Sequence, residues 1–533
     1  MMKIIPQPEQ AVLYPGELTW NRNITVTGEF PVTRALVEQP VAKAADGKAW
    51  PITFLCDESL AKEAYRLEII TDGIRVTAST ETGAFYAWMT MEQLRHNTDK
   101  IPCCWVADAP KYEYRGFMLD CARHFWTIDK IKQFLDVMAS LKMNEFHWHL
   151  SEDQGWRAEI KKYPLLTEKG SIRSNTQLEL KGYWKNKEKH DSVEYGRGMY
   201  YTQDQMREIV AYAAARHIEV VPEIDMPGHM VAAIACYPEL SCTGEPTEVS
   251  NRWGVMDNIC CCGKEDIYRF ARDVIDEMVE IFPGRYFHIG GDEVPKKRWK
   301  TCPACQAKIK ELGLKDENAL QGYFNNEMAK YLRTKGKRMI GWNEVLDARA
   351  IMDRDVIAQW WVHHSVGDRN ELGWLKDGGN CILSLVNYVY MDHSFAVRPL
   401  SKTYKFSHKV LGITNEKNVI GMEIPQWTEY IRDEEKLDML TYPRLIAFAE
   451  VCWTPVDRRN YKDFEQRLEG MRDYFASLDA PICPQRIYRG KTLPWYKCSY
   501  AAKWKAWVDN AYQETEYMHD KLGVWLHPEL KKK

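Results

Sequence analysis

From Tyr114 onward, the chain alternates between two hydrophobic patterns. Short runs of consecutive apolar residues predict buried strands, and longer segments with apolar residues at helical spacing predict helices. Eight strand candidates lie at 116–120, 145–150, 219–224, 286–289, 338–341, 356–360, 381–388 and 419–424. Helical patterns lie between most of them, for example at 128–141, 203–216, 267–281 and 319–334. Eight such units predict a (β/α)8 TIM barrel. A doubly wound open sheet is the alternative, but no G-x-G-x-x-G motif follows an early strand.

The segments on either side of the barrel have different patterns. Residues 67–78 alternate between apolar and polar around Asp72-Gly73, which signals a β-hairpin, and 84–95 has helical spacing. We therefore predict an N-terminal α/β domain of sheet and helix at 1–111, the barrel at 112–480 and a short helical C-terminal extension at 481–533. The extension is rich in aromatic residues, with Trp495, Trp504, Trp507, Tyr512, Tyr517 and Trp525.

The bulk composition is that of an ordinary globular protein. Hydrophobic residues make up 45% and charged residues 28%, and the net charge is −3. This balance provides neither the basic surface of a nucleic-acid-binding protein nor a polybasic membrane patch, and no apolar run is long enough to span a membrane. The first residues are too poor in apolar side chains for a secretory leader. The chain is therefore either intracellular or a trimmed mature form.

The cysteines leave their chemistry open. The chain has 15 of them, and Cys260-Cys261-Cys262 cannot all form local bridges, so some thiols are expected to be free. Cys302-Pro-Ala-Cys305 has the C-x-x-C spacing of a zinc half-site. No second C-x-x-C pair follows it, and we therefore favour a local disulfide or two plain thiols over zinc.

The first indication of chemistry is the segment Tyr286-Phe-His-Ile-Gly-Gly-Asp-Glu293. Gly290-Gly291 permits a tight turn, and the carboxyl ends of parallel strands are where α/β proteins hold their active sites. Adjacent side chains point in different directions, so one acid can donate a proton while the other orients a second group. Asp292 and Glu293 therefore suggest a glycosidase.

Acids, histidines and tryptophans follow seven consecutive predicted strands, beginning with the second. A barrel gathers the ends of its strands around one pocket. The groups are His147 to Asp153, Glu223 to His229, Asp292-Glu293, Trp342 to Glu344, Trp360-Trp361, Tyr390 to His393 and Gln426 to Tyr430.

Three functions could use this pocket. Glycoside cleavage needs a carboxylic acid of raised pKa and aromatic walls for a sugar. A metal-dependent barrel hydrolase could hold zinc with His147, His149, His229 and Asp292, but it has no role for the tryptophans. A non-catalytic sugar-binding protein would keep the tryptophans but would not need Glu293 beside Asp292.

Several motifs, in register over about 112–455, resemble the family 20 glycoside hydrolases, the β-N-acetylhexosaminidases. The motifs are Arg115-Gly-Phe-Met-Leu-Asp-Cys-Ala-Arg-His-Phe125, His147-Trp-His-Leu-Ser-Glu-Asp-Gln-Gly-Trp-Arg157, Val221-Pro-Glu-Ile-Asp-Met-Pro-Gly-His229, His288-Ile-Gly-Gly-Asp-Glu293, Gly341-Trp-Asn-Glu344 and Gln426-Trp-Thr-Glu429. The N-terminal module is similar to the small domain that precedes the barrel in this family.

The resemblance implies a retaining mechanism in which the 2-acetamido oxygen of the substrate attacks the anomeric carbon and forms an oxazolinium ion, an exception to the two-carboxylate scheme. Glu293 would be the general acid and then the general base. Asp292 would stay ionised and accept the acetamido N–H, and Tyr390 would hydrogen-bond the acetamido oxygen. His229 would link Glu293 to an outer acid, with Glu152 at the matching position and Asp153 next to it.

The resemblance also implies which residues bind the sugar. Trp342, Trp361 and Trp427 would enclose it, and Arg115, Asp392 and Glu429 would hold its hydroxyls, although Arg115 begins its strand, where the barrel rule predicts a role in stability. The substrate would be a glycan or oligosaccharide with a terminal β-linked GlcNAc or GalNAc, and no metal or other cofactor is implied. By analogy with family members that act on outside glycans, we expect a periplasmic or extracellular location, with the cytoplasm as the alternative. The sequence does not indicate an oligomeric state.

Overall fold

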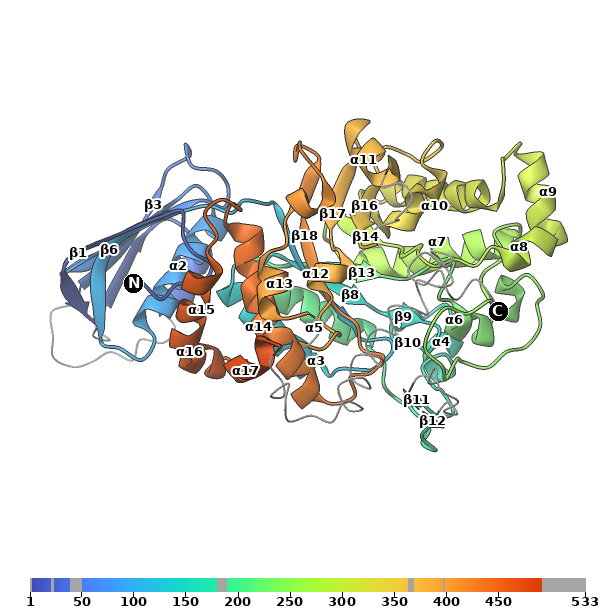
Figure 1. Ribbon diagram of the computed structural model, residues 1–533, viewed down its shortest axis with the longest axis horizontal. Helices are drawn as coiled ribbons and strands as arrows, with labels where there is room; N and C mark the ends of the chain where they lie inside the picture. The colour runs from blue at the N-terminus through green and yellow to red at the C-terminus, as the bar shows by residue number, and fades with distance from the viewer. Residues whose placement is uncertain are drawn as a thin grey trace.

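The computed structural model describes residues 2–20, 24–38, 50–179, 189–362, 369–395 and 398–490. A sheet domain and a barrel lie side by side (Figure 1). The aromatic residues predicted to form a helical extension, from Trp495 to Trp525, lie outside the described residues. In the part of the chain that is described, no helix is long and apolar enough to cross a membrane.

The N-terminal domain is one six-stranded sheet with the strand order β1-β6-β4-β5-β3-β2. The predicted hairpin is confirmed, because β4 and β5 pair antiparallel and Ile70 lies opposite Gly73. The strands are β1 Gln10–Thr19, β2 Ile24–Gly28, β3 Trp50–Cys56, β4 Tyr65–Ile70, β5 Gly73–Ala78 and β6 Lys100–Asp108, and the helices are α1 Pro31–Glu38 and α2 Glu81–Arg95. The predicted helix at 84–95 is thus α2, which begins three residues earlier because Thr80 caps it by accepting a hydrogen bond from Gly83 N.

Eight parallel strands form a closed barrel in the order β13-β14-β15-β16-β17-β18-β7-β8, which confirms the predicted TIM barrel and excludes the open sheet. The strands are β7 Tyr114–Asp120, β8 Glu145–His149, β13 Glu219–Glu223, β14 Tyr286–His288, β15 Arg338–Trp342, β16 Ile357–Trp360, β17 Asn380–Leu383 and β18 Val419–Gln426. The seventh predicted strand, 381–388, is too long. Its apolar run continues past Leu383, but the strand ends at Leu383, opposite Trp360 of β16, and α12 Val386–Val389 follows.

The helices around the barrel begin at capping residues that the sequence contains. Thr127, Asp316 and Asp433 accept hydrogen bonds from the first turns of α3, α10 and α14, and Thr202 forms a capping box with Gln205 on α5. The longer helices are α3 Ile128–Ser140, α5 Gln203–Ala214, α7 Glu265–Ile281, α9 Pro303–Glu311, α10 Glu317–Thr334, α11 Arg369–Lys376, α14 Glu434–Trp453 and α15 Tyr461–Gly470.

Short elements lie in the loops and after the barrel. They are β9 Ser151–Glu152, β10 Gly155–Trp156, α4 Leu165–Glu168, β11 Gln177–Glu179, β12 Lys189–His190, α6 Val231–Cys236, η1 Pro238–Leu240, α8 Lys297–Thr301, η2 Asn343–Ala348, α13 Leu400–Tyr404, η3 His408–Leu411, α16 Arg472–Ala476 and α17 Gln485–Tyr488. Helices α15 and α16 pack near the N-terminal domain (Figure 1), where Arg467 Nη1 donates to Ile4 O at 2.7 Å.

Two layers of side chains fill the barrel. The layer at the amino end is apolar and consists of Tyr114, Val221, Tyr286, Ile340, Ile357 and Ile382. Side chains two residues further along a strand point to the same face, and there the second layer is polar and buried. In this layer His147 Nδ1 lies 2.9 Å from Glu423 Oε1, to which Gln359 Nε2 also donates at 2.6 Å. This hydrogen-bonded layer is the floor of the pocket at the carboxyl end.

Candidate active site

The turn after β14 places Asp292 and Glu293 side by side at the mouth of the barrel. Gly290 and Gly291 have positive φ values of 64° and 90°. A Cβ at Gly290 would lie 1.9 Å from Asp225 Oδ1, which accepts a hydrogen bond from Gly291 N at 3.0 Å. Only glycine fits there. Glu293 itself has a φ of 49°, a strained conformation that is often associated with functional sites.

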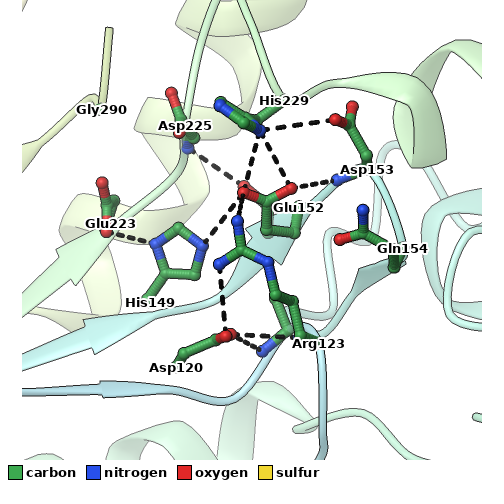
Figure 2. Close-up of polar contacts among 12 residues, drawn as sticks. Asp120, Arg123, His149, Glu152, Asp153, Gln154, Glu223, Asp225, His229 and Gly290 are labelled. Carbon is green, nitrogen blue, oxygen red and sulfur yellow. Dashed lines mark hydrogen bonds and ion pairs between the residues drawn. The ribbon is translucent and has the colours of Figure 1, made fainter. Parts of the chain in front are cut away.

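His229 lies between two pairs of carboxylates. Its Nε2 is 3.5 Å from Glu293 Oε2 and 3.9 Å from Asp292 Oδ2. Its Nδ1 is 3.0 Å from Glu152 Oε1 and 3.4 Å from Asp153 Oδ2, as Figure 2 shows. Both outer acids therefore contact His229, and Glu152 is the closer of the two.

The charges of His229 and of the carboxylates around it follow from burial and from these contacts. Burial alone would lower the pKa of His229, but the carboxylates of Glu152 and Asp153 and the hydrogen bond to Glu293 raise it well above its ordinary value, so the ring stays an imidazolium at neutral pH. Glu152 is buried, yet Arg123 and His229 lower its pKa to about 2. The imidazolium is thus held by an ionised carboxylate on the side away from Glu293.

The surroundings of Asp292 also shift its pKa. Burial raises its pKa to about 7, and although His229 opposes this rise, the carboxylates of Glu344 and Glu293 add to it. Asp292 Oδ1 and Glu293 Oε1 are buried and find no hydrogen-bond partner among the described residues. Both acids therefore have an oxygen available to a ligand in the pocket.

Aromatic side chains enclose the space beyond the acids. Trp342 lies 5.7 Å from Trp427 and 6.3 Å from Trp361 between ring centroids. Trp361 stacks on Tyr390 at 5.9 Å, with 17° between the planes. All four rings are buried. The tryptophans lie at the ends of β15, β16 and β18, and Tyr390 directly follows α12. The three predicted tryptophans and Tyr390 thus form one wall.

Hydrogen bonds to carboxylates orient two of these rings. Trp342 Nε1 donates to Glu223 Oε1 at 2.9 Å, and Trp361 Nε1 donates to Glu344 Oε2 at 2.8 Å. The orientations of the two indole rings are therefore set by the polar layer and by the strand ends.

Arg123, which the sequence analysis did not select, lies in this site. It follows β7 and makes ion pairs with Glu152 at 2.6 Å, Asp120 at 3.3 Å and Glu429 at 3.6 Å. Figure 2 shows Glu152 between Arg123 and His229. The guanidinium also lies 4.9 Å from the centre of the Trp427 ring. Its place after the carboxyl end of the strand was the signal that could have identified it.

Arg115 does not lie in this site, and its predicted contact with a ligand is wrong. It is the second residue of β7, at the opposite end of the barrel, and is 1% exposed. Its guanidinium pairs with Glu63 of the N-terminal domain at 2.6 Å and donates to Lys142 O and Tyr112 O at 2.9 Å and 2.8 Å. Arg115 therefore joins the two domains.

Two predicted acids, Asp392 and Glu429, reach the mouth of the barrel from the loops after β17 and β18. Burial raises the pKa of Asp392 to about 6, although Arg398 opposes the rise. Burial also raises the pKa of Glu429 to about 7, against the effect of Arg123. Both side chains keep some exposure, 21% for Asp392 and 26% for Glu429, so they remain accessible to a ligand at the rim.

The histidines proposed for the metal-dependent alternative have other partners. His147 Nε2 lies 3.0 Å from Glu223 Oε2, and His149 is hydrogen-bonded to the same carboxylate. Burial alone would lower the pKa of His147, but Glu423 and Glu223 raise it to about 10. Within the described part of the chain, the ligand atoms of His147, His149, His229 and Asp292 do not converge as one set.

Comparisons with known proteins agree with this geometry. The model of "Glycosyl hydrolase family 20, catalytic domain" matches residues 112–456, and that of "Glycosyl hydrolase family 20, domain 2" matches residues 1–109. The chain belongs to glycosyl hydrolase family 20.

Relatives within family 20 cover most of the chain. A beta-hexosaminidase of Porphyromonas gingivalis is 38% identical over an alignment of 445 residues that covers 77% of this chain and 53% of the relative. A beta-hexosaminidase of Akkermansia muciniphila is 31% identical over 78% of this chain and 84% of the relative. The chain thus spans about half the length of the first relative.

Solved structures from family 20 have the same fold. An exo beta-N-acetylglucosaminidase from Vibrio harveyi, solved in complex with N-acetylglucosamine, superposes with a TM-score of 0.79 at 29% identity. The superposition covers 91% of this chain and 78% of the other. The beta-N-acetylhexosaminidase of Bacteroides fragilis has a TM-score of 0.78 at 28% identity and covers 92% of this chain and 99% of the other.

Proposed function

We propose that this chain is an exo-acting β-N-acetylhexosaminidase that removes terminal, non-reducing β-linked GlcNAc or GalNAc from a glycan or oligosaccharide and retains the anomeric configuration. The observation that carries the proposal is the adjacent pair Asp292 and Glu293, with His229 behind it and the aromatic wall in front. A non-catalytic sugar-binding protein would need the aromatic wall, but it would not need Asp292 and Glu293 with His229 next to them.

The two acids have different tasks in this proposal. Glu293 donates a proton to the glycosidic oxygen and later takes one from water. The imidazolium of His229, 3.5 Å away, stabilises the glutamate that forms when the proton leaves. Asp292 accepts the N–H of the 2-acetamido group, so that its oxygen faces the anomeric carbon and acts as an intramolecular nucleophile of high effective concentration. Tyr390, beside Trp361, donates to that oxygen.

The walls and the rim recognise the sugar. Trp342, Trp361 and Trp427 cover the apolar faces of the N-acetyl group and of the ring. Arg123, Asp392 and Glu429 bind the hydroxyl groups. Arg123 takes the place in this proposal that the sequence analysis assigned to Arg115, because Arg123 lies at the mouth of the barrel.

The test is release of a chromogenic aglycone from β-GlcNAc and β-GalNAc, measured side by side with and without a chelator. We expect release whose initial rate does not change with the chelator, and the ratio of the two rates then defines the sugar preference. Binding of N-acetylhexosamine without release of product from aryl glycosides or from disaccharide leaving units would contradict the proposal. Loss of the initial rate in a chelator that leaves the circular dichroism and the thermal unfolding midpoint unchanged, with recovery in zinc, would favour the metal-dependent alternative.

The two arginines provide a matched pair of variants. Arg123→Lys should lower kcat/KM about 10²-fold, the size of a lost charge-assisted hydrogen bond. Arg115→Lys should leave kcat/KM nearly unchanged, because Arg115 lies at the opposite end of the barrel. Both arginines lie in buried ion pairs, so both changes should lower the midpoint of thermal unfolding, and kcat/KM distinguishes the two. Kinetics at 25 °C and thermal unfolding measure the two effects.

Deoxy analogues of the substrate separate contact with the sugar from support of Glu152. If Arg123 binds a given hydroxyl, a substrate without that hydroxyl should react more slowly with the wild type. The same substrate should lower the already reduced activity of the Arg123→Lys variant little further. If the loss of activity from the substitution and the loss from the missing hydroxyl simply added for every hydroxyl, the proposed contact would be contradicted.

We propose export to the periplasm or the extracellular space, with the cytoplasm as the alternative. Analogy with enzymes that act on outside glycans supports export. All cysteines in the described residues are free, which is typical of a reducing compartment and supports the alternative.

A further inference from the structure

Four cysteines that are distant in the sequence converge behind the active-site loops. Cys242 follows η1, Cys261 precedes α7, and Cys302 and Cys305 lie at the start of α9. Their Sγ atoms all lie within 4.8 Å of one another, and three of the four residues are buried. Helices α8 and α9, beside this cluster, lie at the end of the molecule opposite the N-terminal sheet (Figure 1).

The sulfur–sulfur distances distinguish between a disulfide and a metal site. Cys261 Sγ lies 3.6 Å from Cys302 Sγ and 3.5 Å from Cys305 Sγ. A disulfide joins sulfurs at about 2.05 Å. Four thiolates at about 2.3 Å from a tetrahedral zinc ion lie about 3.8 Å apart. The observed separations are close to the edge of that tetrahedron, and all four residues are free cysteines.

We propose that Cys242, Cys261, Cys302 and Cys305 bind one structural zinc ion. Soft thiolates in a tetrahedral set select zinc or iron–sulfur centres, and a set of four protein ligands without an open position is typical of structural zinc. The sequence pattern identifies only the Cys302-x-x-Cys305 half-site, for which it favours a disulfide or two plain thiols. The other half does not have C-x-x-C spacing, because Cys242 and Cys261 meet only through the fold.

The ion would join the loops that follow β13 and β14. The first loop contains His229, and the second contains Asp292 and Glu293. Cys260 N donates to Pro227 O at 3.0 Å, close to His229, and Trp299 Nε1 of α8 donates to Cys260 O at 2.9 Å. Cys261 N donates to Leu240 O at 2.7 Å. Zinc would thus cross-link two loops that already pack against each other, and this role does not depend on the proposed function.

Two neighbouring cysteines provide matched variants. Cys261 and Cys262 are both fully buried, but only Cys261 belongs to the cluster. The full chain is purified without chelator, in reducing buffer, from cells supplied with zinc, and its metal content is measured by mass spectrometry. We expect about one zinc ion per wild-type chain and per Cys262→Ala chain, and less than about a tenth of that for Cys261→Ala.

A second variant and a second metal test whether misfolding, and not the loss of a ligand, explains the loss of zinc. Cys242 is only partly buried, so Cys242→Ser changes packing least, and it should lose zinc while its circular dichroism stays that of the wild type. Cobalt(II) exchanged into the wild type should give the absorption of a tetrahedral tetrathiolate complex. Chelation should lower the thermal unfolding midpoint of the wild type and of Cys262→Ala, because metal binding is coupled to folding, and should not change that of Cys242→Ser.

Three results would overturn the proposal. They are a zinc-free wild-type chain with four reactive thiols after zinc supplementation, a disulfide that includes one of the four cysteines, and iron in place of zinc. Equal zinc content in Cys261→Ala and the wild type would also contradict it.

Discussion

Glu293→Gln is expected to reduce kcat for aryl β-N-acetylhexosaminides by about 10²- to 10⁴-fold, the contribution of a positioned general acid. Glutamine keeps the shape of the side chain but cannot donate a proton to the leaving oxygen or take one from water. The contact with His229 Nε2, now at 3.5 Å, remains possible through the amide oxygen, so the fold and the binding of the sugar should be retained. Steady-state kinetics measure the decrease in kcat, and product binding measures whether the sugar is still bound.

The leaving group provides the control for the acid role of Glu293. An aglycone of low pKa needs little protonation when it leaves. The decrease that Glu293→Gln causes in the rate of the glycosylation step should therefore become smaller as the pKa of the aglycone falls. Glu265→Gln, a change of an exposed carboxylate on α7 that pairs with Lys308, should behave as the wild type. Turnover of the Glu293→Gln variant at the wild-type rate would refute the assignment.

Asp292→Asn is expected to reduce kcat/KM for 2-acetamido substrates by about 10²- to 10³-fold, the size of a lost electrostatic contact to the transition state. The neutral amide cannot stabilise the positive charge of the oxazolinium ion, and it can present N–H instead of an acceptor to the acetamido N–H. The loss should be specific to the assisted reaction. An equal loss on a substrate with a different nucleophile would argue against attack by the acetamido oxygen.

The same residue predicts a pH dependence. Burial raises the pKa of Asp292 to about 7, and the ionised form is the active one, so kcat/KM should fall as the pH falls through about 7 and should be constant above it until another group titrates. The acidic limb of kcat/KM reports the free enzyme, and it should disappear in Asp292→Asn. If the fall in kcat/KM at low pH is unchanged in Asp292→Asn, another group is responsible for it. Glu429 is one such group, because burial also raises its pKa to about 7.

The chemistry of the pocket could be predicted because it depends on residues that are close in the sequence. Gly290 to Glu293 form one turn, and the predicted tryptophans each follow a strand that its apolar run identifies. A barrel brings all strand ends of one polarity together, so local patterns were enough to place Asp292, Glu293, Tyr390 and Trp427 around one pocket. The same rule favoured a structural role for Arg115, and the structure confirms that the rule was the better guide there.

The length of β17 and the partners of the buried side chains could not be predicted. An apolar run does not mark where a strand ends, and β17 ends at Leu383 although the run continues. His229 contacts both Glu152 and Asp153, and Arg123 pairs with Glu152 as well. Such contacts are decided by side-chain packing.

The sequence by itself determined the order of strands and helices, the family motifs and the acid pair, since these depend on periodicity and on residues adjacent in the chain. Only the tertiary structure decided that both Glu152 and Asp153 contact His229, and that Cys242 and Cys261 meet the Cys302–Cys305 pair. The physical reason is the same in each case. These contacts join residues from separate loops, and their distances are set by how the closed barrel arranges those loops in space.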